Sequence, residues 1–403
     1  MATYNAGRIN YRIDIKDDFV SKIQKGAMQI LGLFLNGGFS KKGLLLFPFY
    51  SDIDSSIFYQ IKDILDACKI MYHREGSFRK TVSFAKKYKA ISLTETIVAK
   101  FLEVVYKDLA DWIENSDLNL KGEKIKFLQF NESDYSNKFL SPVIGLKNYA
   151  ENELSDELYS LLLHGSLSTL DYVEGWSDFD TFMILKESSL NCQKLIELRR
   201  RIYKSLRYFY QIDPLQHHGH FIITEIDLQF YPNSFIPTIV LENAKPLFGP
   251  PKIKLKKNCD KAGVLRNYEN MCKAMEGYSK IIKPSIYQRK RFYHYVLLFP
   301  CLFLQSIGKP IYKKQSFENA KSYFESHIWE VVEDISMVRT NWNPNYLEKF
   351  YVNTYWNPRL GRVISNKLIS YNSLIKGSKE YRKRVEKAKE LYTKGLEIIK
   401  TSN

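Results

Sequence analysis

Two short motifs, separated by eleven residues, restrict what this chain can fold into more than any other feature. Gly165 and Ser166 directly follow a run of three leucines and a histidine, and Asp178 and Asp180 open an apolar run that ends at Leu185. Apolar runs of this length, bounded by turn residues, predict buried strands. Side chains two positions apart on a strand point to the same face, so the two carboxylates can meet at one metal cluster.

The residue types of the two motifs suit a nucleotide and a metal ion. A glycine lets the backbone approach a polyphosphate closely, Ser166 offers a hydroxyl group, and the amides of a helical turn predicted over 167–172 can bind an anion. Asp178 and Asp180 offer the hard oxygen ligands that Mg²⁺ prefers, together with water and phosphate oxygens. The competing interpretation is a structural turn followed by a solvated acidic strand end.

Together the motifs resemble the signature of the nucleotidyltransferase superfamily of DNA polymerase β. That signature is an apolar residue and Gly-Ser, a gap of about this length, and then Asp-x-Asp between apolar residues. The resemblance covers residues 160–250, and it implies an α+β fold with a small mixed β-sheet core, an NTP as the donor substrate, and two Mg²⁺ ions as cofactors. The matching residues are Gly165, Ser166, Asp178 and Asp180.

The resemblance also implies a third metal ligand, on the strand that follows the next helix. Residues 190–207 interleave apolar residues with Arg and Lys at helical spacing and predict that helix. The run 208–213 is the first strand expected after it, and it ends in Asp213. We therefore expect Asp178, Asp180 and Asp213 to form the metal site.

Other interpretations of this stretch stay open. Asp213 precedes a proline, and an Asp-Pro pair often does no more than begin a turn. Glu225 and Asp227, on the apolar run 221–230, are alternative third carboxylates. The third ligand is thus Asp213 or one of these two acids.

Three histidines, His217, His218 and His220, follow Asp213 within a short segment. A zinc site would want four ligands at finger-like spacing, and no cysteine lies near enough in sequence to complete one. We expect these histidines to line the mouth of the active site or to cap a hairpin. His218 is a candidate for contacting the substrate or accepting a proton.

The segment 213–231 is also weakly similar to glutamine-synthetase adenylyltransferases. In those enzymes the third metal ligand precedes a polar strand, a glycine turn and a downstream Leu and Tyr. The arginines that they carry just after the acid are absent here, and Gln216, His217 and His218 stand in their place. Because of this difference the resemblance does not identify the acceptor, but it does not affect the prediction of the metal site.

Helical periodicity surrounds the predicted catalytic core on both sides. We expect 1–140 to form a mostly helical N-terminal domain, 141–255 the nucleotidyltransferase domain, and 256–403 a C-terminal helical domain. Such a bundle helps to wall the acceptor pocket in the similar kanamycin-modifying nucleotidyltransferases. Within it, Arg289 or Lys290 either contacts the nucleotide or simply forms a basic helix face. The expected helices are 19–35, 52–71, 151–159, 267–282, 286–306, 316–335, 346–356 and 371–400.

The net charge of +16, from 60 Lys and Arg against 44 Asp and Glu, favours anionic partners. Part of this charge is concentrated in the lysines between 252 and 261 and in a basic helix over 376–389. A nucleoside triphosphate accounts for a basic lip near the core, and a lysine-rich helix is also typical of a solvated surface. No zinc finger or helix-turn-helix spacing is evident, so nucleic acid is not the favoured partner.

The remaining composition bears on compartment. Five scattered cysteines without paired spacing argue against a disulfide framework. The first residues lack the apolar core of a signal peptide, and no apolar run approaches the roughly 18–20 residues of a membrane span. We therefore predict a cytoplasmic protein with no membrane partner.

The sequence thus predicts an enzyme that moves a nucleoside monophosphate from an NTP to a hydroxyl of a small-molecule or protein acceptor, with pyrophosphate released. Asp178 and Asp180 would bridge two metal ions. Asp213 would complete the second ion's site or accept the acceptor's proton, and Gly165 and Ser166 would hold the phosphates. A template-independent RNA nucleotidyltransferase and a non-catalytic binding protein that retains the fold are the alternatives.

Overall fold

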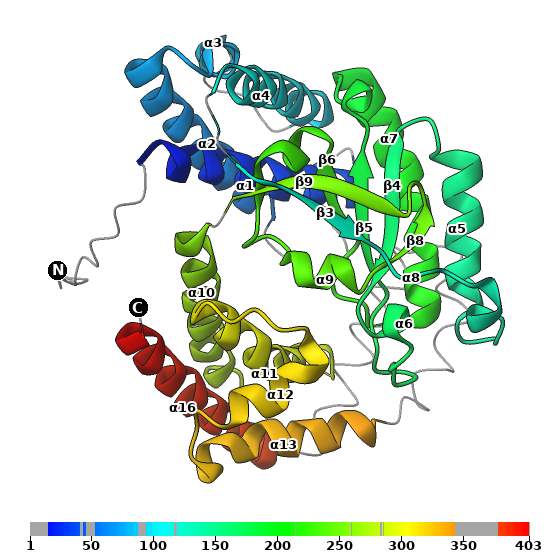
Figure 1. Ribbon diagram of the computed structural model, residues 1–403, viewed down its shortest axis with the longest axis vertical. Helices are drawn as coiled ribbons and strands as arrows, with labels where there is room; N and C mark the ends of the chain where they lie inside the picture. The colour runs from blue at the N-terminus through cyan, green and yellow to red at the C-terminus, as the bar shows by residue number, and fades with distance from the viewer. Residues whose placement is uncertain are drawn as a thin grey trace.

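The computed structural model describes residues 15–40, 43–45, 53–87, 94–116, 118, 120–213, 215–258, 260–282, 284, 286–342 and 378–402. Within them the fold is mixed α+β, as the sequence predicts, with helices on either side of small mixed sheets (Figure 1). None of the helices in these ranges combines the length and the apolarity that a membrane span requires.

Helices dominate the N-terminal part of the chain, as its periodicity predicts. The elements are α1 (Ile15–Asn36), the hairpin strands β1 (Gly38–Ser40) and β2 (Gly43–Leu45), α2 (Ile53–Glu75), α3 (Arg79–Lys87) and α4 (Glu95–Asn115). Helix α1 buries a stripe from Val20 to Phe34 and ends where two glycines follow. The side chain of Thr94 caps α4 by accepting a hydrogen bond from the amide of Ile97. The predicted helices over 19–35 and 52–71 are confirmed.

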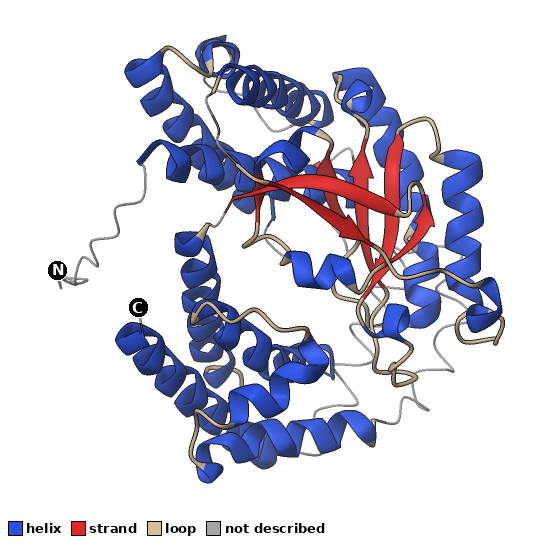
Figure 2. Ribbon diagram, viewed as in Figure 1, coloured by secondary structure: helices blue, strands red, loops and turns tan. Residues whose placement is uncertain are grey.

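A four-stranded mixed sheet lies at the centre of the molecule (Figure 2). Its strands are β4 (Leu158–His164), β5 (Asp180–Leu185), β6 (Phe221–Thr224) and β8 (Lys245–Phe248). Their order across the sheet is β6-β5-β4-β8; β4 runs antiparallel to β5 and β8, and β5 runs parallel to β6. Both faces of the sheet are covered, which explains why β4 and β5 are nearly continuous apolar runs.

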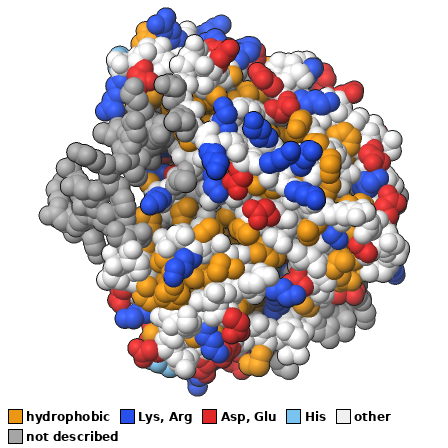
Figure 3. Space-filling model, in the orientation of Figure 1, with side chains coloured by type: hydrophobic (Ala, Val, Ile, Leu, Met, Phe, Trp, Pro, Cys, Tyr) orange, Lys and Arg blue, Asp and Glu red, His pale blue; other side chains and the backbone are white. Residues whose placement is uncertain are grey.

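A second, smaller sheet crosses the front of the central one (Figure 1). It consists of β3 (Gly122–Lys126), β9 (Lys252–Asn258) and β7 (Tyr231–Pro232). Apolar residues of β3 and β9 pack against the central sheet, and lysines point outward (Figure 3). The antiparallel register sets Lys124 opposite Lys254 and Lys126 opposite Lys252, and we call these four exposed residues the lysine ribbon.

Helices connect the strands, and one of them forms where the sequence predicts a strand. These elements are η1 (Glu132–Tyr135), α5 (Ser141–Glu153), α6 (Ser166–Thr169), η2 (Glu187–Ser189), α7 (Cys192–Ser205), α8 (Arg207–Ile212), η3 (Ile226–Phe230) and α9 (Thr238–Glu242). The strand predicted over 208–213 is wrong, because this stretch forms α8. Its buried residues, Phe209 and Ile212, are three apart and face the core as on a helix, which overrides the strand preference of the aromatic residues.

Two further boundaries differ from the sequence analysis. The helix predicted over 151–159 ends at Glu153, because Leu158 already begins β4. The apolar run 221–230 is a strand only to Thr224 and continues as η3. Helix α7 confirms the predicted helix over 190–207.

Alternate residues of the central sheet enter different hydrophobic clusters. Leu163 and Met183 belong to a large cluster that also contains α1, α4, α5 and α7, and Leu162 and Phe182 belong to one with β3 and β9. The large cluster thus joins the N-terminal helices to the sheet in one core. The division of the chain into three domains stays a prediction.

The C-terminal helices pack around a third cluster. They are α10 (Lys261–Ser279), α11 (Ile286–Ser306), α12 (Lys313–Lys321), α13 (Ser326–Thr340) and α16 (Ser378–Ser402). The helix predicted over 286–306 is confirmed, whereas the one predicted over 316–335 is interrupted between α12 and α13. The helix predicted over 346–356 and the beginning of the one predicted over 371–400 lie outside the described residues.

Asp227 is fully buried and ties three elements together. Its Oδ2 accepts hydrogen bonds from the amide and hydroxyl of Thr224 and from the hydroxyl of Tyr106, and its Oδ1 accepts one from Gln24. Asp227 and Glu225 follow the end of β6 that pairs with Leu185, remote from Asp180. The two alternative third carboxylates therefore lie away from the Asp178–Asp180 motif, and Asp227 has a structural role.

Replacement of Asp227 tests this role. Asp227→Ala would leave several buried donors without a partner, at a cost of about 1–3 kcal/mol each in the free energy of unfolding. Asp227→Asn keeps an oxygen for Thr224 and Tyr106, and its amino group can face Oε1 of Gln24, which makes no other hydrogen bond. We expect the Asn variant to be much the more stable of the two in urea denaturation; equal losses would contradict the assigned network.

The pH dependence of the same variants carries a second prediction. Burial raises the pKa of Asp227 from 3.8 to about 6, so the folded state holds this proton more tightly than the unfolded state. The wild-type free energy of unfolding should therefore fall as the pH rises through this interval, and Asp227→Asn should lack that part of the fall. Urea denaturation at pH 5 and pH 8 measures the difference; identical pH dependence in both proteins would contradict it.

Candidate functional site

The Gly-Ser turn lies directly beside the second aspartate of the Asp-x-Asp motif. The β4–β5 register pairs His164 with Asp180, so the residue after His164 meets the start of β5. Gly165 has a φ of +70°, and a Cβ atom on it would lie 2.3 Å from Oδ2 of Asp180. Only glycine fits this close approach and this backbone conformation. Ser166 then begins the single-turn helix α6.

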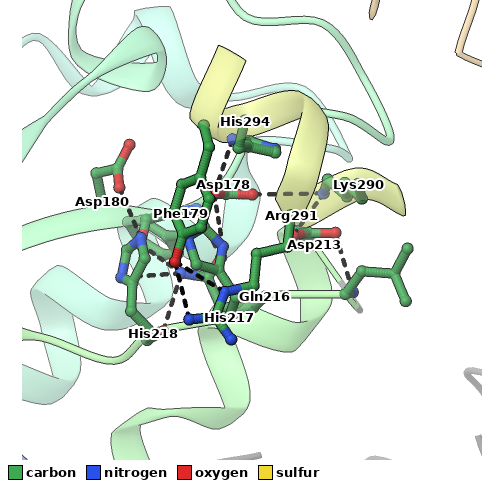
Figure 4. A network of polar contacts seen from close by, with 12 residues as sticks. Asp178, Phe179, Asp180, Asp213, Gln216, His217, His218, Lys290, Arg291 and His294 are labelled. Atoms are coloured by element: carbon green, nitrogen blue, oxygen red, sulfur yellow. Dashed lines mark hydrogen bonds and ion pairs between the residues drawn. The ribbon is translucent and has the colours of Figure 1, made fainter. Parts of the chain in front are cut away.

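The first aspartate, Asp178, lies just before β5 and is surrounded by two histidines and a lysine (Figure 4). Its Oδ2 is 3.1 Å from Nδ1 of His217 and 3.6 Å from Nδ1 of His294, and its Oδ1 is 3.4 Å from Nζ of Lys290. Asp180 pairs with another histidine, with 3.0 Å between its Oδ1 and Nε2 of His218. Each aspartate of the motif thus faces imidazole nitrogens.

The third predicted acid, Asp213, and Asp178 both contact the same lysine, Lys290. Its Oδ2 is 2.6 Å from Nζ of Lys290, and its Oδ1 accepts a hydrogen bond from the amide of Leu215. The side chains of Asp213 and Lys290 are 1% and 2% exposed. The structure therefore brings Asp213 close to Asp178, but with the ammonium group of Lys290 in contact with both.

The site has an open and a closed side. The side chains of Asp180, His217 and His218 are 24%, 23% and 19% exposed, so this side reaches solvent. Lys290 and Asp213, on the other side of Asp178, are sealed. A ligand can therefore approach the histidine side directly, whereas the lysine side is part of the interior.

Gln216 fixes the two chain segments of the site against each other. Its Oε1 accepts a hydrogen bond from the amide of Phe179, and its Nε2 donates to the carbonyl oxygen of Phe179. This buried clamp joins the residue between the two aspartates to the segment that carries His217 and His218. His218 is oriented further by its Nδ1, which is 2.9 Å from the carbonyl oxygen of Gly219.

His220 belongs to the core rather than to the site. Its two ring nitrogens meet the hydroxyl groups of Thr181 and Ser205, at 2.7 Å and 2.9 Å, and burial lowers its pKa to about 3. The amide of His220 also donates to Asn36 of α1. With both nitrogens engaged, His220 is no ligand for a metal beside Asp178.

The protonation of the site follows from burial and these contacts. Burial opposes the charge of Asp178, yet the contacts with His294, Lys290 and His217 hold the pKa of this carboxyl well below its ordinary value. Burial lowers the pKa of His217 and, further, that of His294, so both imidazoles are neutral near pH 7. Asp178 is therefore ionised beside two neutral imidazoles.

His218 and Asp213 are perturbed in the opposite direction. Burial lowers the pKa of His218, but the hydrogen bond with Asp180 outweighs it and raises this pKa to about 9. Burial raises the pKa of Asp213 well above its ordinary value, against the attraction of Lys290. His218 thus carries a proton near pH 7, which a bound cation would displace.

One group of side chains in the described residues has its donor atoms arranged for a metal ion. The group is Asp178, His217 and His218, whose ligand atoms all lie within 4.8 Å of one another. Asp213 is not a member, and its role as a metal ligand stays a prediction. His217 and His218 lie on the solvent-exposed side of the site, as the sequence predicts, whereas His294 is a site residue that no sequence motif indicates.

The contribution of α11 has a signal that the sequence analysis did not use. Lys290 and His294 are four residues apart and therefore share one face of this helix. The ring of His294 stacks on Trp176, at 4.8 Å between ring centroids, and Trp176 is part of the cluster formed by the C-terminal helices. Trp176 precedes Asp178 by two residues, so this stacking brings α11 to the motif.

Comparisons of the chain with protein-family models, with curated proteins and with solved structures found no match. The two halves of the candidate site, the Gly-Ser turn and the aspartate motif, are adjacent in space as well as in the sequence pattern.

Replacing Gly165 with alanine tests the close approach of the turn to Asp180. Gly308→Ala is the matched control, because Gly308 also has a positive φ (+76°) but no atom within 4 Å of its Cβ position. The strained backbone costs each variant about 1–3 kcal/mol, and only Gly165→Ala displaces the Asp180 carboxylate. We expect a larger loss in the free energy of unfolding for Gly165→Ala.

The same pair of variants has a spectroscopic readout. The pKa of His218, about 9 in the wild type, should fall in Gly165→Ala as Asp180 is pushed away, and it should stay unchanged in Gly308→Ala. NMR titration of the histidine ring protons measures it. An unchanged His218 pKa in Gly165→Ala would refute the contact.

Proposed function

We propose that the protein transfers a nucleoside monophosphate from an NTP to a hydroxyl group of an acceptor, at the site formed by the Gly-Ser turn and Asp178 and Asp180. The observation that carries this proposal is the contact between Gly165 and the carboxylate of Asp180. A turn whose backbone can approach phosphates lies against ionised carboxylates, which is the arrangement that phosphoryl chemistry needs.

The donor atoms around Asp178 fit one divalent cation. Asp178, His217 and His218 would hold it, with Asp180 adjacent to His218. When bound, such a cation neutralises phosphate charge and lowers the pKa of a hydroxyl group that contacts it. The predicted site with two cations bound by Asp178, Asp180 and Asp213 fits the structure less well, because Lys290 lies between Asp178 and Asp213.

The chain itself would supply phosphate binding. The backbone at Gly165 and the hydroxyl of Ser166 would bind the β- and γ-phosphates beside Asp180, and pyrophosphate would leave from there. Nε2 of His294 makes no hydrogen bond within the described residues, but this atom is buried, so an acceptor hydroxyl on the open side does not reach it. Asp213 is sealed by Lys290 and does not reach an acceptor.

The direct test is label transfer from each α-³²P-labelled NTP, with Mg²⁺ or Mn²⁺, in the presence and absence of cell extract. Asp178→Asn and Asp180→Asn should abolish transfer, and Asp180→Asn should do so with an unchanged circular dichroism spectrum, because the side chain of Asp180 is 24% exposed whereas Asp178 is buried against Lys290. Asp156→Asn is the matched control, since Asp156 is exposed and lies outside the site, and it should retain full transfer. Transfer that survives in either site variant would refute the proposal.

The lysine ribbon favours a second candidate, transfer to RNA. Lysines directly opposite each other on neighbouring strands repel, and a phosphodiester backbone would relieve that repulsion. In the labelling assay, product would then appear in the RNA fraction. Lys124→Gln/Lys254→Gln should reduce it, while labelling of small molecules would be unaffected. The non-catalytic alternative requires that no fraction takes up label with any NTP.

A further inference from the structure

The buried side of the site holds a protein cation between two carboxylates. Nζ of Lys290 lies 3.4 Å from Oδ1 of Asp178 and 2.6 Å from Oδ2 of Asp213, and the three side chains are at most 5% exposed. Two carboxylates this deeply buried need a positive charge between them. Helix α11 supplies that charge as an ammonium group, whose Nζ also lies 5.8 Å from the centre of the Trp176 ring.

The open side of the site has the spacing of ligands to a single ion. Neighbouring donors of an octahedral ion with bonds of about 2.1 Å lie about 3 Å apart. The corresponding distances are 3.1 Å between Oδ2 of Asp178 and Nδ1 of His217, and 3.0 Å between Oδ1 of Asp180 and Nε2 of His218. The donor atoms of Asp178, His217 and His218 all lie within 4.8 Å of one another, so these three residues can close around one ion, with Asp180 beside His218.

A second contact prepares His218 for metal binding. Its Nδ1 faces the carbonyl oxygen of Gly219 at 2.9 Å, so the proton on that nitrogen is fixed and Nε2 is directed into the site. Histidine ligands of metals are almost always oriented by a carbonyl or carboxylate acceptor on the other ring nitrogen. The segment 216–219 therefore has the features of a ligand loop.

We infer that the site binds one divalent transition-metal ion through mixed nitrogen and oxygen ligands, and that Lys290 takes the place of a second ion. The ligands of the ion are Asp178, His217 and His218, and Asp180 lies beside His218. Imidazole donors favour Fe²⁺, Co²⁺ or Zn²⁺ over Mg²⁺, which prefers oxygen. Mn²⁺ binds more weakly than these ions but still accepts mixed ligands, and it serves here as a paramagnetic probe. The inference concerns the cofactor of the proposed nucleotidyl transfer, and in that respect it rests on the proposed function.

The first experiment counts ions in the full-length apoprotein without nucleotide. Mn²⁺ is titrated, and free Mn²⁺ is measured by electron paramagnetic resonance. We expect one tightly bound Mn²⁺ per chain, and competition by Mg²⁺ that is at least about tenfold weaker. His217→Ala and His218→Ala should each weaken Mn²⁺ binding at least about tenfold, in line with the sensitivity of metal sites to loss of a ligand. Two tight sites in the wild type, or unchanged affinity in both histidine variants, would overturn the inference.

The second experiment addresses Lys290. Lys290→Met removes the ammonium group and leaves Asp178 and Asp213 without a counter charge, so this variant should bind two Mn²⁺ ions per chain. Lys290→Met/Asp213→Asn is the matched control and should return to one ion. A single site in a folded Lys290→Met variant would overturn the substitution of lysine for metal. If Lys290→Met does not fold, Lys290→Gln, which also removes the charge but keeps polar atoms for the two carboxyl groups, takes its place with the same expected and contradicting outcomes.

The outcomes separate this inference from the proposed function. Metal binding is measured without NTP, so one bound ion in a protein that transfers no label would refute the proposed function and leave the metal site standing. Label transfer by a protein that binds two ions would refute the metal assignment and leave the proposed function standing.

Discussion

The charge of Asp178 is the constraint on which the rest of the site depends. A buried carboxylate is stable only when its oxygens are compensated, and here the compensation comes from elements far apart in the sequence. The segment before β6 contributes His217, and α11 contributes Lys290 and His294. The central sheet and the C-terminal helices therefore meet at Asp178, where the helices supply the positive charge that the buried carboxylate needs.

The central sheet fixes the position of this carboxylate, because the register of its strands cannot change. Both of its faces are buried, so β4 and β5 cannot slip by one residue without turning apolar side chains out of two clusters. The fixed register sets Gly165 against Asp180, and the amide clamp of Gln216 holds Phe179 between the two aspartates. The register of the two strands and the Gln216 clamp therefore fix the positions of the site residues.

Much of the fold was predictable from local pattern. The long amphipathic helices, such as α1 and α11, and the apolar strands around the Gly-Ser and Asp-x-Asp motifs were recognised from their periodicity. The stretch 207–212 was not, because its Tyr and Phe residues favour a strand locally and only burial of Phe209 and Ile212 in the core selects a helix. Where a segment's local strand preference competes with helical packing, the tertiary contacts decide its secondary structure, and these contacts cannot be seen in the sequence.

The site was predictable in part for the same reason. Asp178, Asp180 and Gly165 lie within one motif, and their proximity follows from strand geometry. Lys290 comes from a helix more than a hundred residues downstream. The sequence marks it only as part of a basic segment that could contact a nucleotide or form a basic helix face, and not as a partner of Asp178. Long-range pairing of charges has no local signature, so the position of Lys290 between Asp178 and Asp213 could not be predicted from the sequence.

The central claim is that a triphosphate and a divalent ion meet between the Gly-Ser turn and Asp178. The most direct measurement is a crystal structure with Mn²⁺ and a non-hydrolysable NTP analogue, with anomalous scattering recorded at the manganese edge. The account predicts one anomalous peak, within about 2.0–2.3 Å of Asp178 and His217, with the phosphates of the analogue against Gly165 and Ser166. A peak elsewhere, or phosphates bound away from the turn, would contradict it.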